Sequence, residues 1–397
     1  KILPVLINCN VALNDKGNLV SSSCILRDVS DIFKLEREKE SLTEKVIQLT
    51  RKIPLNDNEK RVFEGIVSFP EYNDIQLSKL LKIKRSTVTA IKNKLKREHY
   101  FATHKIPHFT SIGCEMAIAV SFRLNPTAKL QKEVASLIED INQVPESVYL
   151  IASGNNLLCI QMTKNLTEFK KQMDSLIASY KTNDVIAQSK VHYFPFETSQ
   201  IPKFLNFSRY LSLLFELEPQ PGSKKPKPKI ESFTKKEKQI FYALVKYGDL
   251  NDSEIAAQTG LARPSISQVR RKLIERGSIT EANVPDPLKL RSELAVQNHV
   301  TFDFDDKQKM ESIRKHIESD PSTYLMLAGD AEIISLHLYN DYSSFQTEHN
   351  NLMTLFNEHS ISYDNFESTL YPVTQLKKHL IQFDPLVKKS LGLSTSI

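Results

Sequence analysis

The sequence contains few cysteines and no long apolar run. Its four cysteines, Cys9, Cys24, Cys114 and Cys159, show none of the spacings that mark metal sites or redox motifs, so we expect buried thiols in a reducing compartment. No apolar run reaches the length of a membrane span, and the first residues lack the layout of a signal peptide. These absences predict a cytoplasmic protein that does not contact a membrane.

The common sequence signatures of catalysis are also missing. No phosphate-binding loop, nucleophile elbow or HExxH stretch occurs. His104 and His108 are four residues apart, but Pro107 lies between them, which favours a strand or wing over a shared helix face. We therefore predict no catalytic residue, no metal ligand, no cofactor and no enzymatic activity.

Length and charge set broad limits on the architecture. A chain of 397 residues has room for about two to four domains. A hydrophobic content of 40% with 25% charged residues is typical of a folded soluble protein. The net charge of +6 and the pI of about 8.8 indicate an anionic partner only weakly, so the positions of the cations matter more.

A helical pattern occurs twice. The stretch "KIKRSTVTAIKNKLKREHYF" (82–101) aligns without a gap with "GLARPSISQVRRKLIERGSI" (260–279). Each copy places apolar residues at i, i+3 and i+7 of a helix, which gives one buried stripe: Val88, Ile91 and Leu95, then Ile266, Val269 and Leu273. An upstream helix also recurs, as "NEKRVFEGIV" and "KEKQIFYALV". Three such helices predict a helix-turn-helix domain in each copy.

The residues outside the buried stripes are the candidate DNA contacts. Hydroxyl, amide and guanidinium groups reach phosphates and base edges in a major groove, and lysines hold the phosphate backbone. The candidates are Arg85, Ser86, Thr87, Thr89, Lys92, Asn93 and Lys96 in the first copy, and Arg263, Ser265, Ser267, Gln268, Arg270 and Arg271 in the second. Lys94, Arg97 and Lys272 are further candidates for backbone contacts. This pattern predicts double-stranded DNA as a partner.

A second pattern follows each helical copy. Strand-like and helix-like stretches alternate in the order strand, helix, strand, strand, helix, strand, which predicts a ferredoxin-like sandwich twice. Tyr149 with Gly154, and Tyr324 with Gly329, mark the same hairpin in the two copies, where we expect glycine to permit the bend.

Each half of the chain resembles the leucine-responsive and asparagine regulator (Lrp/AsnC) family. The resemblance covers nearly all of Asn56 to Tyr371. It is carried by "LSKLLKIKRSTVTAIKNKL" and "YLIASGNNLLCIQMTKNLTEF" in the first half, and by "SEIAAQTGLARPSISQVRRKL" and "YLMLAGDAEIISLHLYNDYSSF" in the second. It implies a winged helix-turn-helix joined to a ferredoxin-like effector and assembly domain. Because family members pair through their sheets, one duplicated chain is expected to form a pseudo-dimer.

The resemblance also implies a small-molecule effector. The family usually has an acidic residue shortly after the hairpin glycine, whereas the first copy has Asn155 and Asn156 and the second has Asp330. The sequence therefore leaves the effector and its binding residues unknown.

The first residues resemble the end of a PAS sensor domain. Two strand-like runs joined by Asn-Asp-Lys-Gly precede Asp28-Val29-Ser30, which is similar to the triplet that closes such domains. Only the last strands are present, so we expect a fragment without a complete PAS pocket. A heptad seam follows and predicts a homodimer through a coiled coil; its residues are Ile32, Leu35, Leu42, Val46, Leu49 and Ile53.

These observations predict an α+β transcription regulator made of seven segments. The segments are a PAS remnant (1–30), a signalling or coiled-coil helix (31–54), winged helix-turn-helix 1 (55–113), ferredoxin-like domain 1 (114–215), a proline- and lysine-rich linker (216–233), winged helix-turn-helix 2 (234–291) and ferredoxin-like domain 2 with a C-terminal helix (292–397).

Two other functions stay open. One is an enzyme similar to the siroheme decarboxylases, which pair Lrp-like halves around a tetrapyrrole; His192, Tyr193 and His337 are its conceivable donors. The other is an assembly scaffold that does not bind DNA.

Overall fold

The structure is a computed structural model of the 397-residue chain. It describes residues 5–13, 19–28, 53–126, 131–220, 232–302, 307–361 and 366–393, and the first two of these ranges as backbone only. The chain divides into two compact units, residues 1–54 and 55–397, and each is described by itself.

The first unit contains an antiparallel hairpin of β1 (Val5–Leu13) and β2 (Leu19–Asp28), in which Cys9 lies opposite Cys24. The prediction of two paired strands is thereby confirmed. The predicted coiled-coil seam from Ile32 to Leu49 lies outside the described residues.

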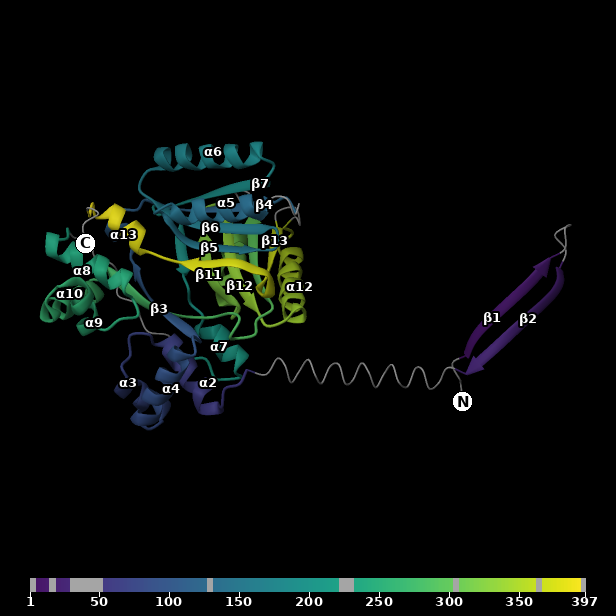
Figure 1. The fold of residues 1–397 in the computed structure, drawn as a ribbon, viewed down its shortest axis with the longest axis horizontal. Helices are drawn as coiled ribbons and strands as arrows, with labels where there is room; N and C mark the ends of the chain where they lie inside the picture. Colours follow the sequence, from purple (N-terminus) through teal and green to yellow (C-terminus); the bar gives the residue numbers. More distant parts are fainter. Residues whose placement is uncertain are drawn as a thin grey trace. The chain divides into compact units, whose positions relative to one another are not determined.

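Two three-helix units occur in the second unit (Figure 1). The first consists of α2 (Asp57–Ser68), α3 (Asp74–Leu81) and α4 (Arg85–Arg97). The second consists of α8 (Lys235–Lys246), α9 (Asp252–Thr259) and α10 (Arg263–Glu275). The buried stripe of α4 is as predicted, whereas in α10 only Ile266 and Leu273 are buried and Val269 is half-buried.

The turns before α4 and α10 both use a left-handed residue. Lys82 adopts φ 55° and ψ 40°, and Gly260 adopts φ 68° and ψ 6°, each as the C-cap of the preceding helix. Glycine reaches this region without steric cost, whereas a residue with a Cβ atom does not. Lys82 therefore adopts a backbone conformation that glycine reaches at a lower free-energy cost.

A two-stranded ribbon joins the three-helix units. It pairs β3 (Phe101–Pro107) with β9 (Ile279–Pro285), antiparallel, with His104 opposite Ala282. His104 thus lies on a strand, as its sequence context predicted. Because each strand directly follows the third helix of its own unit, the ribbon fixes the two units to each other.

Two five-stranded sheets form the rest of the second unit. The first half contributes η1 (Phe109–Ile112), β4 (Met116–Leu124), α5 (Gln131–Gln143), β5 (Ser147–Ser153), β6 (Asn156–Thr163), α6 (Leu166–Thr182), β7 (Ile186–Pro195), β8 (Gln200–Lys203) and α7 (Ser208–Leu214). The second half contributes β10 (Leu294–Thr301), α11 (Lys307–Ser319), β11 (Thr323–Ala328), β12 (Glu332–Tyr339), α12 (Tyr342–Glu358), β13 (Phe366–Pro372), η4 (Val373–Gln375), β14 (Leu376–Ile381) and α13 (Asp384–Ser390). Both halves thus show the predicted order of strands and helices.

The two halves exchange their last strands. The sheet orders are β14-β5-β6-β4-β7 and β13-β10-β12-β11-β8, so β8 of the first half completes the second sheet and β14 of the second half completes the first. Lys203 of β8 anchors this exchange, because its buried ammonium donates to the carbonyl oxygens of Asp320 at 2.9 Å and Thr323 at 3.1 Å. The helix after each exchanged strand contacts a three-helix unit: α7 contacts α2, and α13 contacts α8.

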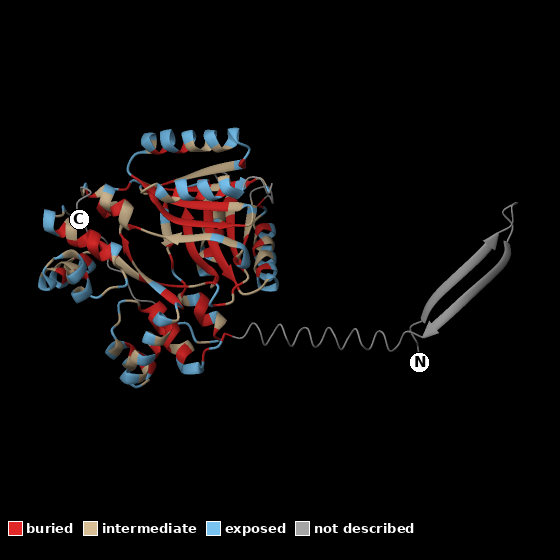
Figure 2. Ribbon diagram, viewed as in Figure 1, coloured by how far each residue is buried: buried red, intermediate tan, exposed pale blue. Residues whose placement is uncertain are grey.

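Each sheet has helices on one face and the other sheet on its opposite face. Helices α5 and α6 cover the first sheet and α11 and α12 the second, with apolar clusters between helices and strands. Between the sheets, Tyr149 Oη and Tyr324 Oη are 2.8 Å apart, and Ser121 is hydrogen-bonded to Gln297. Figure 2 shows the strands as the most buried part of this unit, with exposed outer faces on α6 and α12.

The hairpins between the central strands differ in detail. Gly154 has a φ of 55° in the first, whereas Gly329 does not enter the positive-φ region. A Cβ atom at Gly329 would lie 3.4 Å from the Phe194 ring and 3.5 Å from the carbonyl oxygen of Glu332. These are ordinary van der Waals distances, so neither the bend predicted from the sequence nor the packing requires glycine at position 329. Separately, within the described residues, no helix has the length and apolar character needed to cross a membrane.

Candidate functional site

The helices of the two three-helix units differ in how they begin. Four of the six start with a capping box, in which the N-cap side chain and the N3 side chain satisfy each other's backbone N–H groups. Their N-cap residues are Asn56, Asn73, Thr234 and Asn251. The other two helices, α4 and α10, have Lys84 and Ala262 as N-cap residues and receive no hydrogen bond from an N-cap side chain. The first N–H groups of α4 therefore receive no N-cap acceptor and are available to an anion. In α10 only the first N–H group, that of Arg263, is comparable, because Pro264 has no N–H and Ser265 N–H donates to the carbonyl oxygen of Ala262 at 3.0 Å.

The predicted DNA contacts fall into two groups by exposure. Eight of them are exposed: Arg85, Ser86, Asn93, Lys96, Arg263, Ser267, Gln268 and Arg271. The remaining five are half-buried: Thr87, Thr89, Lys92, Ser265 and Arg270. Arg85 and Arg263 are the first residues of α4 and α10, beside the N–H groups that lack a side-chain cap.

Several candidate contacts bind partners within their own unit. Thr89 donates a 2.6 Å hydrogen bond to Asp74, and Lys92 forms an ion pair with the same carboxylate at 3.2 Å. In the second unit Ser267 donates to Asp252, and Arg270 lies 2.6 Å from that carboxylate. The pairs occur at matching positions, so they hold α4 against α3 and α10 against α9.

A second set of ion pairs joins the first and third helices. Lys94 lies 2.7 Å from Glu59, and Lys272 forms the corresponding pair with Glu237. The hydrogen bond from Lys272 lowers the pKa of Glu237 to about 2. Lys94 and Lys272, which the sequence suggested as phosphate contacts, thus neutralise carboxylates that also serve in capping boxes. Lys96 lies 3.4 Å from Asp249, in the loop before α9.

A polar cleft of about 590 Å³ lies at one end of the space between the sheets. It is bordered by the hairpin after β5, by β4 and β7 of the first half, and by β13 of the second. Arg123 and Lys190 contribute cationic groups, and Lys190 pairs with Glu367. Its other polar lining residues include Ser121, Asn156, Gln188 and Thr369. The cleft can therefore accept a small polar or anionic molecule.

The corresponding positions at the other end hold two histidines and a glutamate. The strand registers place His299, Glu332 and His192 where the first cleft has Ser121, Asn156 and Thr369. His192 Nδ1 lies 2.8 Å and His299 Nε2 3.0 Å from Glu332 Oε2. Burial alone would raise the pKa of Glu332, but the hydrogen bonds from both histidines hold it at about 2.

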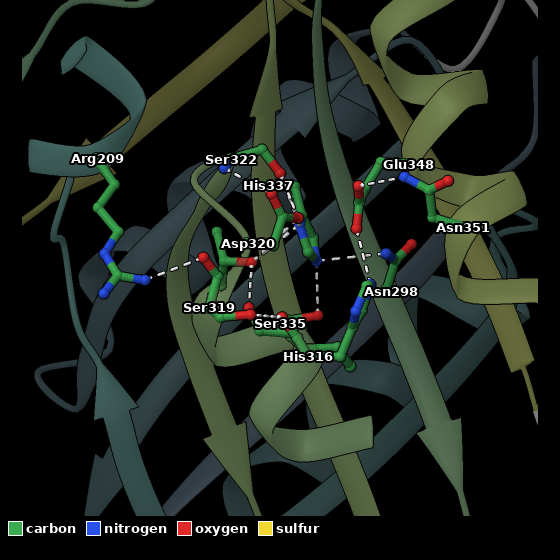
Figure 3. Close-up of polar contacts among 12 residues, drawn as sticks. Arg209, Asn298, His316, Ser319, Asp320, Ser322, Ser335, His337, Glu348 and Asn351 are labelled. Atoms are coloured by element: carbon green, nitrogen blue, oxygen red, sulfur yellow. Dashed lines mark hydrogen bonds and ion pairs between the residues drawn. The ribbon is translucent and has the colours of Figure 1, made fainter. Parts of the chain in front are cut away.

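A buried polar cluster lies between β12 and α11, shown in Figure 3. His337 Nε2 lies 2.8 Å from Ser335 Oγ, and His337 Nδ1 lies 2.9 Å from Asp320 Oδ2. Serine, histidine and aspartate therefore follow one another as in a serine hydrolase triad. However, Ser335 is 0% exposed, and the adjoining cavity of about 10 Å³ has room for about one water molecule. We interpret this cluster as a structural network that satisfies buried polar groups.

Sequence reasoning considered only part of these features. It named His192 and His337 but passed over His299, Glu332 and Asp320. It also placed Tyr193 among conceivable donors, whereas Tyr193 packs on the helix side of its strand, 6.3 Å from the Phe169 ring. The available signal was the strand alternation, which places His192 on the face opposite Tyr193.

Comparison with protein families matches residues 231–290 to the family described as the sugar-specific transcriptional regulator TrmB. No curated protein sequence matches the chain. The matched segment contains all three helices of the second three-helix unit and its ribbon strand.

Comparison with solved structures gives two kinds of match. The siroheme decarboxylase NirDL shares 11% identity with this chain, covers 84% of it and 98% of its own chain, and has a TM-score of 0.48. AsnC of E. coli shares 16% identity over 35% of this chain and 91% of its own, with a TM-score of 0.28. PF0864 of Pyrococcus furiosus, a member of the AsnC family, shares 14% identity over 35% of this chain and 88% of its own, with a TM-score of 0.29.

One sequence-based prediction is corrected by these matches. The prediction that the chain is not an enzyme is wrong as stated, because the solved structures that cover most of the chain belong to an enzyme, siroheme decarboxylase NirDL. The prediction of a regulator keeps the support of the TrmB match over residues 231–290.

Proposed function

We propose that this protein is a DNA-binding transcription regulator in which α4 and α10 are the recognition helices of two winged helix-turn-helix units. The observation that carries the proposal is the selective lack of caps. Four helices of the two units have a complete capping box, and the two that would enter the grooves have no side-chain cap. An uncapped helix N-terminus is a favourable binding site for phosphate, because it carries the positive end of the helix dipole and backbone N–H groups without a side-chain acceptor.

The charges around these N-termini support the same role. Arg85 and Arg263 are exposed on the first turn of their helices, where a guanidinium reaches phosphate or guanine. Neither forms an ion pair with another described residue. In contrast, Lys94 and Lys272, on the inner side, are paired with carboxylates. Exposed cations on one face and neutralised cations on the other favour DNA binding through the outer face.

We further propose that the two halves arose by internal duplication and together supply the pseudo-dimer that AsnC-type regulators form from two chains. The recurrence of Thr89 with Asp74 as Ser267 with Asp252, and the exchange of β8 and β14, support this. The two ferredoxin-like parts would hold the assembly and bind an effector in the 590 Å³ cleft. The segment 31–54 would pair two such chains into a homodimer.

The test is binding of the full chain to a random-sequence duplex library, followed by fluorescence anisotropy on the enriched sequence. We expect Arg85→Ala/Arg263→Ala to weaken binding about tenfold or more, because one lost base contact costs about 1 to 3 kcal/mol. Lys315→Ala is the control, since Lys315 is an exposed cation on α11, away from both helices. Failure of the wild-type chain to bind any duplex would contradict the proposal and leave the enzyme and the assembly scaffold as candidates.

A second candidate function is an enzyme that acts on an iron tetrapyrrole, as the matched decarboxylase does on siroheme. The observation that favours it is the cleft between the sheets, whose Arg123 and Lys190 could hold carboxylate groups. Tetrapyrroles absorb strongly in visible light, so a titration with siroheme followed by absorbance tests binding directly. We expect Arg123→Ala to abolish the spectral shift if this candidate is correct. An unchanged siroheme spectrum with wild-type protein would exclude it.

A further inference from the structure

The cluster of His192, His299 and Glu332 brings three donor groups to one point from three strands. His192 comes from β7 of the first sheet, while His299 and Glu332 come from β10 and β12 of the second. One ligand atom of each residue lies within 4.8 Å of the others. The side chains are 12%, 14% and 24% exposed, so bulk water reaches them only in part.

The paired strands fix the positions of these three side chains. Thr301 lies opposite Glu332 in the β10–β12 register, which places His299 and Glu332 close together on one sheet face. His192 approaches from the facing sheet, and its ring centroid lies 4.2 Å from that of His299. Side chains on paired strands vary less in position than those on loops, so the donor set is preorganised.

The geometry of the cluster differs from an ordinary histidine–carboxylate pair. His316 and Glu348, which join α11 to α12 at 2.9 Å, form such a pair with one histidine. In the cluster, both His192 Nδ1 and His299 Nε2 point at the same oxygen of Glu332. Two imidazoles and one carboxylate form the His₂Glu donor set of many zinc sites. With metal–ligand distances of about 2.0–2.2 Å, tetrahedral ligand atoms lie roughly 3.3 Å apart, so the two histidine–glutamate contacts of 2.8 and 3.0 Å need to lengthen only slightly.

We propose that His192, His299 and Glu332 bind one divalent transition metal ion of the zinc class, which links the two sheets. Three protein ligands leave a fourth position for water or for a ligand atom. The ion would bind through the neutral imidazoles and the ionised carboxylate, in place of the protons that now join them. This role is independent of DNA binding, so the failure of one proposal does not decide the other.

The equivalent positions at the other end of the sheet interface lack metal ligands, so the proposal applies to one end only. Ser121, Asn156 and Thr369 occupy the equivalent positions there and provide no imidazole or carboxylate. The two ends therefore differ in metal chemistry although their backbone registers match. The expected stoichiometry is one ion at this site per chain.

The experiment is a titration of chelator-treated full chain with Zn²⁺ in competition with a chromophoric indicator. We expect one tight equivalent for the wild type. His299→Gln and Glu332→Gln should each weaken binding by more than the roughly 10–100-fold that loss of an outer-shell partner costs. His316→Gln is the control, because it breaks a histidine–carboxylate pair, more exposed than the cluster, in which only one histidine contacts the carboxylate. Its zinc affinity should equal that of the wild type.

A spectroscopic measurement covers the case in which a variant fails to fold. Co²⁺ bound to wild-type protein by two imidazoles and a carboxylate should give the intense visible absorption of a four- or five-coordinate ion. The absence of a tight zinc equivalent in the wild type, or a Co²⁺ spectrum like that of the hydrated ion, would overturn the proposal. So would equal zinc affinities of the wild type and a folded His192→Gln/His299→Gln variant.

Discussion

The hydroxyl groups of Tyr149 and Tyr324 lie 2.8 Å apart at equivalent positions of the two sheets, and both side chains are almost fully buried. Removing one hydroxyl leaves the other without its partner in a site that water does not reach. We expect Tyr149→Phe to lower the free energy of unfolding by about 1 to 3 kcal/mol. Tyr149→Phe/Tyr324→Phe should lose less than the sum of the single variants, because it leaves no unpaired hydroxyl. Urea unfolding of all four proteins measures this coupling, and strict additivity would contradict it.

The backbone of Lys82 offers a test of the turn before α4. Because Lys82 has a φ of 55°, Lys82→Gly should stabilise the protein by about 1 kcal/mol, less than the full left-handed penalty of roughly 1–2 kcal/mol. Lys79→Gly, in the last turn of the same helix, should instead destabilise it by about 1 kcal/mol. Shifts of the urea midpoint in the same direction for both variants would rule out the conformational explanation.

The two proposed recognition helices are expected to differ in their use of charge. Arg263 precedes Pro264, whose fixed φ suits the first turn of α10, so we expect the second unit to read bases more closely. Arg263→Ala should cost about 1 to 3 kcal/mol on the preferred duplex and relax base preference. Arg85→Ala should weaken binding to all sequences and reduce the salt slope by about 1. Anisotropy titrations at several salt concentrations measure both, and the reverse assignment would refute this difference.

The Glu237–Lys272 pair predicts a pH dependence of stability. The hydrogen bond from Lys272 lowers the pKa of Glu237 to about 2 in the folded protein, below its ordinary value of 4.5. The unfolded chain therefore takes up the proton first, and the pair stabilises the fold above about pH 4.5 and loses that effect as pH falls toward 2. Glu237→Gln should be less stable than the wild type at pH 7, with a difference that shrinks between about pH 5 and 2. A constant difference across this range would contradict the linkage.

The local elements could be predicted from the sequence because their signals are local. The spacing of Val88, Ile91 and Leu95 defines the buried side of α4, and Asn73 with Gln76 gives the start of α3. The exchange of β8 and β14 could not be predicted, since short strands such as Gln200–Lys203 carry no pattern that selects a partner sheet. The sequence therefore suggested two separate domains where the structure has two interlocked ones.

The cluster of His192, His299 and Glu332 between the sheets could not be predicted from the sequence for a similar reason. His192 and His299 are far apart in sequence, and strand alternation reveals only that each points away from the helices of its own half. Whether such a face meets water or a second sheet depends on tertiary packing. One signal was available: all seven residues of β5 are buried, and a strand buried on both faces indicates a second layer.

The covalent connection of the two halves removes a constraint that applies to a symmetric dimer. In a homodimer every substitution appears twice, so the two ends of the interface must carry the same groups. Here one end presents Ser121 and Asn156 beside an open cleft, while the matched positions at the other end carry His299 and Glu332. Single-chain architecture thus lets one end specialise without altering the other, and because the halves are tethered, dilution cannot separate them.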